Sequence, residues 1–161
     1  MSNTYKTVKK CLLCGCAFES YTCSHGKYCS LSHAYLHRTV LGYMTTKSEM
    51  RRLSVPIKAW LAGFWEGEGN LSIRPKYRNY NLSIAQNEKR VIYFIKKLVP
   101  FGTVYTHKCK NTIMTQFMLH GIGSSLAFIE SILPYVHSKK RIKTINEFLT
   151  KVNIKGFKQY V

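Results

Sequence analysis

The spacing of the apolar residues after Ser54 is the feature that most constrains how this chain can fold. They recur at helical spacing from Val55 to Trp65, and two alternating, strand-like runs follow, NLSIR and YNLSIAQ. A helical stripe over 91–98, two more strand-like runs and two helical stripes over 126–133 and 142–152 complete the pattern. This order predicts an α+β domain with helices on one face of a four-stranded antiparallel sheet.

The cysteines indicate a separate N-terminal module. Five of the six lie within 19 residues, while Cys109 stands alone. The five are Cys11, Cys14, Cys16, Cys23 and Cys29. We therefore expect a small module over residues 1–38, a linker or short helix over 39–54, and the α+β domain over 55–161.

Metal binding is the best explanation of these cysteines. The pairs Cys11-x2-Cys14 and Cys29-x3-His33 have the spacing of tetrahedral zinc ligands, and so short a segment needs such a staple. Disulfides are the alternative, but the start of the sequence lacks a signal-peptide pattern, which favours a reducing intracellular compartment. Spacing alone leaves further candidate ligands, which are Cys16, Cys23, His25 and His37.

The net charge predicts a polyanionic partner. The 161 residues include 25 Lys and Arg and only seven acids, all of them Glu, for a formal charge of +18. Nucleic acid is the first candidate and an anionic membrane surface the second. We do not expect a membrane protein, because no apolar run approaches the roughly 20 residues of a spanning helix.

Two of the seven acids lie close together in the segment LAGFWEGEG, Leu61 to Gly69. We expect Gly67 and Gly69 to end the first helix, which places Glu66 and Glu68 at its C-terminus. Carboxylates are disfavoured there by the helix dipole, so a bound cation is expected to compensate them, and oxygen ligands suit Mg²⁺. A solvated acidic turn is the alternative.

This segment resembles the signature of the LAGLIDADG homing endonucleases, and the similarity extends over about residues 55–152, including IAQNEK, FGTVY and LPYVHSKKR. The resemblance implies a DNA endonuclease with an αββαββα domain, in which Glu68 binds catalytic Mg²⁺ and Glu66 supports it. It also implies that Gln86 orders solvent around the metal and that Lys139 lies near the scissile phosphate.

The N-terminal segment is similar to treble-clef-type zinc knuckles, which often accompany endonuclease domains. That resemblance implies four zinc ligands, Cys11, Cys14, Cys29 and His33, with His in the fourth place. The module is expected to extend the DNA footprint through phosphate contacts rather than to take part in the chemistry. The basic residues expected to make these contacts are Lys27, Arg38, Arg51 and Arg52.

Strand alternation predicts which side chains face DNA. With Leu71, Ile73, Leu82 and Ile84 toward the helices, polar residues of the same two strands face outward. An antiparallel ribbon fits the major groove, where such side chains read base edges. The predicted contacts are Ser72, Arg74, Lys76, Asn79, Asn81, Ser83, Gln116 and Met118. For the third strand, either Lys108 with Lys110 or His107 with Cys109 fits the outward side.

The sequence contains one LAGLIDADG-like motif. A double-strand break therefore requires two chains, and we expect a homodimer on a near-palindromic site. The expected contact face is Leu61, Ala62, Gly63 and Phe64, where small residues permit close helix packing. Two other functions remain open. The first is an intron RNA maturase, because the family includes such proteins and a positive sheet could hold RNA. The second is a nucleic-acid-binding protein that has the fold but has lost catalysis.

Overall fold

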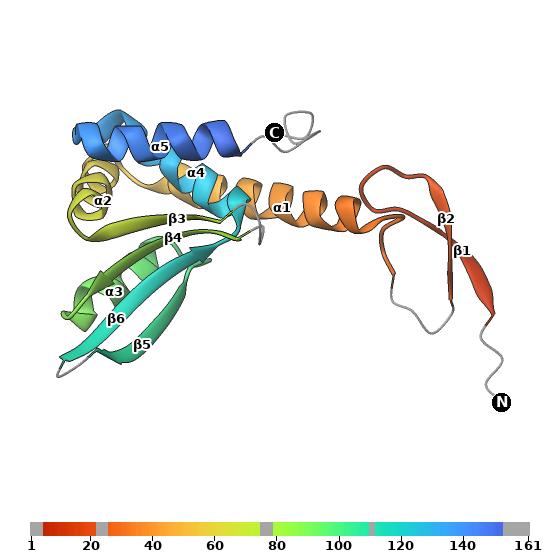
Figure 1. The fold of residues 1–161 in the computed structure, drawn as a ribbon, viewed down its shortest axis with the longest axis horizontal. Coiled ribbons are helices and arrows are strands. Elements are labelled where there is room, and N and C mark those ends of the chain that lie inside the picture. The colour runs from red at the N-terminus through yellow and green to blue at the C-terminus, as the bar shows by residue number, and fades with distance from the viewer. Residues whose placement is uncertain (1–4, 22–25, 75–78, 110–111, 153–161) are drawn as a thin grey trace. The chain divides into compact units, whose positions relative to one another are not determined.

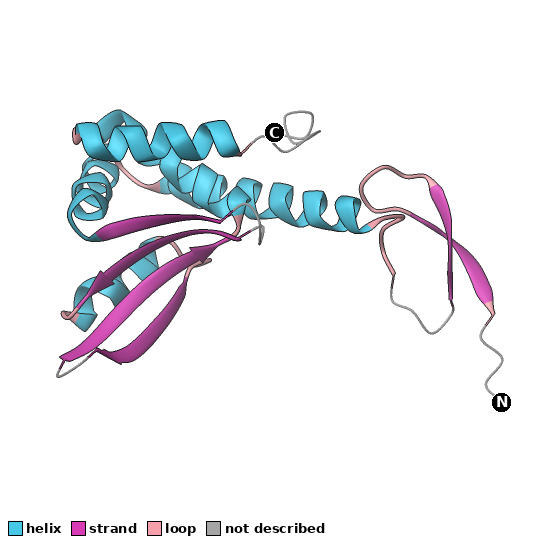
Figure 2. Ribbon diagram, in the orientation of Figure 1, coloured by secondary structure: helices cyan, strands magenta, loops and turns pink. Residues whose placement is uncertain are grey.

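The computed structural model describes residues 5–21, 26–74, 79–109 and 112–152, with the backbone alone at Arg74, Asn79 and Cys109. These residues divide into two compact units, and the division falls after Val40. Figure 1 labels the elements along the chain, and Figure 2 separates helices from strands.

The first unit contains an antiparallel hairpin of β1 (Lys6–Lys10) and β2 (Ala17–Tyr21). The turn between these strands is tight: the Cys11 N–H donates to the Cys16 carbonyl and the Gly15 N–H to the Cys11 carbonyl, each at 2.9 Å. Gly15 has a φ of 72°, a conformation that glycine adopts without steric cost. The hairpin therefore presents Cys11 and Cys14 from a closed turn.

Helix α1 (Leu31–Arg52) begins in the first unit and ends in the second. The stretch expected to be a linker or short helix is thus helical from residue 39 to Arg52. Its residues Tyr43, Thr46 and Met50 are buried at helical spacing. The Tyr43 hydroxyl donates to Glu130 Oε2 at 2.6 Å, and Lys47 forms an ion pair with the same carboxylate. These contacts make the second half of α1 part of the second unit.

The second unit is built on a four-stranded antiparallel sheet in the order β3-β4-β6-β5. Its strands are β3 (Gly69–Arg74), β4 (Asn79–Gln86), β5 (Thr103–Cys109) and β6 (Thr112–His120). Its helices are α2 (Val55–Glu68), α3 (Lys89–Leu98), α4 (Ile122–Ile132) and α5 (Lys139–Lys151), with the 3₁₀ turn η2 (Leu133–Tyr135) before α5. The predicted α+β fold is confirmed.

The core lies between one face of this sheet and the helices. The sheet contributes Leu71, Leu82, Ile84, Phe117 and Leu119, and the helices contribute Leu61, Trp65, Ile92, Ile95, Phe128, Ile129, Ile145 and Phe148, all of them buried. Burial of apolar side chains on alternate strand positions leaves the other sheet face outside the core, as the alternation predicts. None of the described helices combines the length and the apolar character needed to cross a membrane.

The end of α2 differs from the prediction. Gly67 is helical, and the helix continues to Glu68. Gly69 follows with a φ of −84°, so it needs no left-handed conformation. A side chain would not fit at this position, because a Cβ would lie 2.1 Å from Trp65 Cδ1. Glycine is therefore required here by the packing of the buried indole beneath the turn into β3.

Candidate functional site

Glu66 is held by the residues that lead into α5. Its Oε1 accepts hydrogen bonds from the backbone N–H groups of His137, at 2.6 Å, and of Ser138. Ser138 is also the N-cap of α5, where the helix dipole favours an anion. The unfavourable position of Glu66 at the C-terminus of α2 is thus compensated by the N-terminus of another helix.

Glu68 has no such compensation. It is the last residue of α2, its side chain is exposed, and it makes no hydrogen bond or ion pair with the residues that the structure describes. Within those residues it also belongs to no cluster of three or more acidic, histidine or cysteine side chains. Its carboxylate is therefore accessible to a cation.

Gln86 and Lys139 flank this end of the domain through different elements. Pairing of Gly69 with Ile84 places the start of β3, directly after Glu68, at the sheet end where β4 finishes with Gln86. The Gln86 Oε1 accepts from the Asn87 N–H at 2.8 Å. Lys139 is the exposed first residue of α5, next to the Ser138 N–H that binds Glu66. The strand register therefore places Gln86 at the sheet end next to the end of α2. The hydrogen bond from Ser138 to Glu66 places the neighbouring Lys139 near the same helix end.

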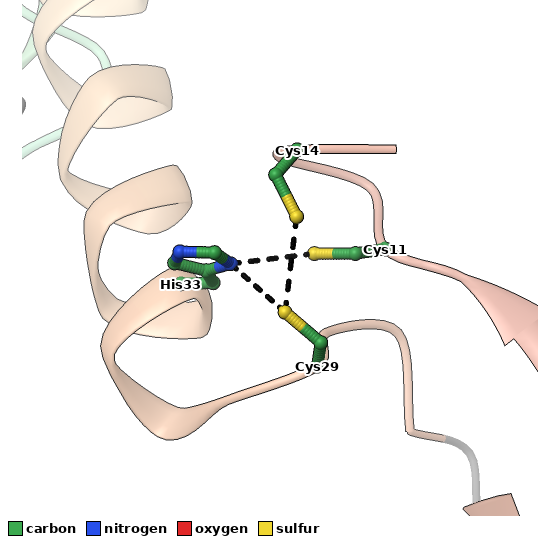
Figure 3. Close-up of side chains that lie close together, drawn as sticks. All are labelled: Cys11, Cys14, Cys29 and His33. Atoms are coloured by element: carbon green, nitrogen blue, oxygen red, sulfur yellow. Dashed lines mark hydrogen bonds between the residues drawn. The ribbon is translucent and has the colours of Figure 1, made fainter. Parts of the chain in front are cut away.

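A second candidate site lies in the first unit, where four side chains converge (Figure 3). The ligand atoms of Cys11, Cys14, Cys29 and His33 all lie within 4.8 Å of one another. His33 Nδ1 is 3.0 Å from the Cys29 sulfur and 3.7 Å from the Cys11 sulfur, and the sulfurs of Cys14 and Cys29 are 3.8 Å apart. The hairpin turn supplies the thiols of Cys11 and Cys14, the segment before α1 supplies Cys29, and the first turn of α1 supplies His33. This Cys3His cluster contains the four residues that the treble-clef resemblance implies.

The other candidate ligands stand differently. Cys16 is exposed and outside the cluster. His37 Nδ1 is 2.7 Å from the Tyr28 hydroxyl, and the two rings are in contact. Cys23 and His25 lie outside the described residues.

The thiols of the cluster do not share one charge state. At Cys11, burial acts to raise the pKa, but hydrogen bonds from backbone amides and His33 outweigh it and lower the pKa to about 5. At Cys29, burial and hydrogen bonds with the thiols of Cys14 and Cys11 raise the pKa to about 12. The hydrogen bond with Cys11 raises the pKa of His33. Close sulfur atoms therefore resist further deprotonation unless a cation joins them.

The predicted DNA-contacting residues on the outward sheet face differ in how far their side chains are exposed to solvent. Ser72, Gln116 and Met118 are partly exposed. Asn81 is also partly exposed, and its Oδ1 accepts from the Gly121 N–H at 3.4 Å, so it supports the turn after β6. Ser83 is only 6% exposed, because its small side chain lies between longer neighbours on a central strand. The structure describes only the backbone of Arg74 and Asn79, and Lys76 lies outside the described residues.

The register of β5 resolves the third strand. Thr106 is paired with the buried Thr115, so His107 and Cys109 belong to the outward side and Lys108 to the helix side. The same parity adds Tyr105 and His120, whose Oη and Nε2 atoms are 3.1 Å apart. The sequence prediction missed this pair, although continuing the alternation of Gln116 and Met118 would have reached His120.

The predicted contact face of α2 needs correction. Leu61 and Ala62 are fully buried within their own chain, so the prediction that they contact a partner is wrong. Gly63 is exposed, with no atom within 4 Å of a Cβ built there, and Phe64 is half-buried. Trp60, 38% exposed, stacks on Phe64 with the ring centroids 5.3 Å apart. The outward face of α2 therefore combines an open glycine with two aromatic rings.

Comparisons with known proteins identify the family of this chain. A LAGLIDADG endonuclease family model matches residues 61–160, and no curated protein matches the chain. Among solved structures, the homing endonuclease I-CvuI bound to its target with calcium aligns at 25% identity and a TM-score of 0.46, over 63% of this chain and 69% of that one. An archaeal intron-encoded homing endonuclease complexed with DNA aligns at 17% identity and a TM-score of 0.42, over 58% and 63%. With most of its length matched by the family model, the chain belongs to the LAGLIDADG endonuclease family.

Proposed function

We propose that this protein is a magnesium-dependent, sequence-specific homing endonuclease that makes a double-strand break in DNA. The observation that carries the proposal is the difference between the two acids of the motif: Glu66 accepts two backbone hydrogen bonds, whereas Glu68 is exposed and has no hydrogen bond or ion pair among the residues that the structure describes. An exposed carboxylate that no neighbour neutralises fits a hard divalent cation. Glu68 is therefore the residue that we assign to Mg²⁺.

The chemistry follows from the groups around this acid. When bound, Mg²⁺ would activate water and neutralise charge that develops on the scissile phosphate. Gln86, at the adjacent sheet end, is assigned to orienting solvent through its amide. Lys139, exposed at the start of α5, is assigned to the phosphate, where its ammonium group stabilises negative charge in the transition state.

Sequence recognition is assigned to the outward sheet face. This face is not covered by the core, and its described side chains include amide, hydroxyl, imidazole and thioether groups but no carboxylate. Such groups read base edges without repelling phosphates. Arg74, Lys76 and Asn79 remain predicted contacts. Double-stranded DNA is accordingly the proposed partner.

The sharpest test of the proposed function is cleavage of a randomised or insertion-site DNA library in Mg²⁺ and in EDTA. We expect cutting at a restricted set of near-palindromic sites in Mg²⁺ and none in EDTA. Absence of metal-dependent cutting at every site would contradict the nuclease assignment. Retained binding to intron RNA without DNA cleavage would instead support a maturase.

A homodimer is part of this proposal, because one chain offers one Glu68 and two strands must be cut. Helices approach closely where small residues leave space, and Gly63 provides that space next to Phe64, whose ring stacks on Trp60. We therefore assign the dimer contact to the outward face of α2, with Gly63 and Phe64 retained from the sequence prediction and Trp60 added.

Replacing Gly63 with leucine should separate pairing from folding. No atom lies within 4 Å of a Cβ built at this exposed position, and helix propensity favours leucine over glycine by roughly 0.5–1 kcal/mol, so the monomer should keep its melting temperature. It should nevertheless block close helix contact. Sedimentation of the DNA complex is expected to show two chains per duplex for the wild type and for the exposed α1 control Ser48→Leu, but not for Gly63→Leu. A one-to-one wild-type complex would contradict the dimer.

For the first unit we propose a structural Zn²⁺ bound by Cys11, Cys14, Cys29 and His33. The donor set fits, because three sulfurs and one imidazole nitrogen already lie within 4.8 Å of one another and suit tetrahedral zinc. We also propose an intracellular, reducing compartment, in which these thiols would remain available as ligands.

Zinc binding should release protons. Cys29, with a pKa of about 12 in the cluster without a cation, is protonated at pH 7 and must lose its proton to bind zinc. Cys11, with a pKa of about 5, is already a thiolate and releases none. The apparent zinc affinity should therefore fall as pH falls. Calorimetric titrations at pH 7 in two buffers with different ionisation enthalpies should give different heats; equal heats would refute the prediction.

A further inference from the structure

Arg141 makes two specific contacts with the end of α2, although it belongs to the first turn of α5. Its Nε–H donates to the backbone carbonyl of Glu66 at 2.9 Å. Its guanidinium carbon lies 5.2 Å from the centre of the Trp65 ring, within the range of a cation–π contact. The side chain is half-buried, and both contacts lie within three residues of Glu68.

The hydrogen bond satisfies a group that α2 itself leaves unpaired. The last carbonyls of a helix lack the N–H donors of a following turn. Here the Trp65 carbonyl accepts from the Gly69 N–H, but the chain then enters β3 and supplies no helical donor for the Glu66 carbonyl. Arg141 supplies that donor, and its positive charge is favourable at the negative end of the helix dipole.

The cation–π contact lies on the other side of the same turn. Trp65 is fully buried, and Gly69 packs so closely on its indole that a Cβ would lie 2.1 Å from Cδ1. Trp65 and Glu66 before Glu68, and Gly69 after it, therefore each make a contact that restricts the turn. Glu68 is thus an exposed carboxylate on a fixed section of backbone.

We propose that Arg141 is a positioning residue that fixes the backbone of Glu68 for cation binding. The inference rests on the proposed function for the role of Glu68 and adds the residue that orients it. Arginine suits this task because a planar guanidinium donates through Nε–H while its face stacks on an aromatic ring, which a lysine ammonium cannot reproduce. Lys140, its exposed neighbour on α5, offers the same charge without these contacts.

Terbium luminescence of the full-length protein tests this role without requiring cleavage. Tb³⁺ is a hard cation that takes oxygen ligands, and Trp65 lies close enough in the chain to Glu68 to sensitise it. We expect Glu68→Gln to abolish the sensitised signal and Arg141→Ala to weaken Tb³⁺ affinity by about tenfold, because a small misplacement of a ligand is costly. The Tb³⁺ affinity of Arg141→Lys should remain clearly weaker than that of the wild type. The affinity of Lys140→Ala should equal that of the wild type.

Hydrogen exchange of the same variants supplies a structural readout. Amides following Glu66 in the turn into β3 should exchange faster in Arg141→Ala than in wild type or Lys140→Ala. Unchanged Tb³⁺ affinity in Arg141→Ala, or full rescue by Arg141→Lys, overturns the positioning role while leaving Glu68 as the ligand. A Tb³⁺ signal that survives in Glu68→Gln overturns the proposed function, and with it the purpose assigned to Arg141.

Discussion

Replacing Glu68 with glutamine is expected to reduce the rate of magnesium-dependent DNA cleavage by at least about a hundredfold. The change keeps the size of the side chain but removes the carboxylate charge that we propose binds Mg²⁺. Stabilisation of the transition state by the metal is worth several kcal/mol. Because Glu68 is exposed and makes no hydrogen bond or ion pair within the described residues, the variant should fold normally. Single-turnover cleavage at saturating enzyme measures the effect.

Glu147→Gln is the matched control, since it removes the same charge from an exposed position on α5. It should cleave like wild type. DNA binding in calcium should be unchanged or stronger for Glu68→Gln, because one negative charge near the phosphates has been removed. Cleavage by Glu68→Gln at the wild-type rate would remove this residue from the mechanism.

Glu66→Gln should behave differently, although it lies only two residues away. Its carboxylate accepts two backbone N–H groups at the start of α5, and charged hydrogen bonds of this kind contribute more than neutral ones. Loss of the charge should therefore lower the melting temperature as well as the activity. This contrast separates the acid that supports the site from the acid that we assign to the metal.

The amino-acid pattern is sufficient to predict the sheet of the second unit because the signals of its strands are local. Alternation in NLSIR and YNLSIAQ fixed which sheet face joins the core, and the buried Leu82 and Ile84 confirm it. The four clustered zinc-ligand candidates were also found from short spacings. In both cases the information lies within a few residues.

Features that depend on distant contacts were not predictable in the same way. The polar sequence of the second half of α1 favours a linker or a short helix. Its helix is instead held by the hydrogen bond from Tyr43 to Glu130 on α4, a contact between distant residues that the sequence does not show. Sequence spacing alone does not show that Leu61 and Ala62 are buried, because the side of α2 that packs inward depends on its contacts with α4 and with the sheet. The contact of Arg141 with Glu66 joins residues 75 positions apart, and no spacing rule could reveal it.

Replacing Cys29 with serine is expected to unfold the first unit while leaving the second intact. Residues 5–40 contain a two-stranded hairpin, which is marginal alone in water, and several large apolar side chains there are exposed, including Tyr5, Val8 and Leu31. So little buried surface leaves the metal as the main stabilising term, and structural zinc in small modules supplies roughly 10–16 kcal/mol. Purified Cys29→Ser should lose about one zinc per chain.

Hydrogen exchange locates the effect of this substitution. Amides of β1 and β2 should lose protection in Cys29→Ser, whereas those of β4 and β6 should keep it, because the second unit has its own core. Cys16→Ser is the matched control: its thiol is exposed and outside the cluster, so zinc content and protection should match wild type. An unchanged zinc content in Cys29→Ser would exclude this residue as a ligand. If cleavage persists with weaker DNA affinity, the module contributes binding and leaves the chemistry to the end of α2.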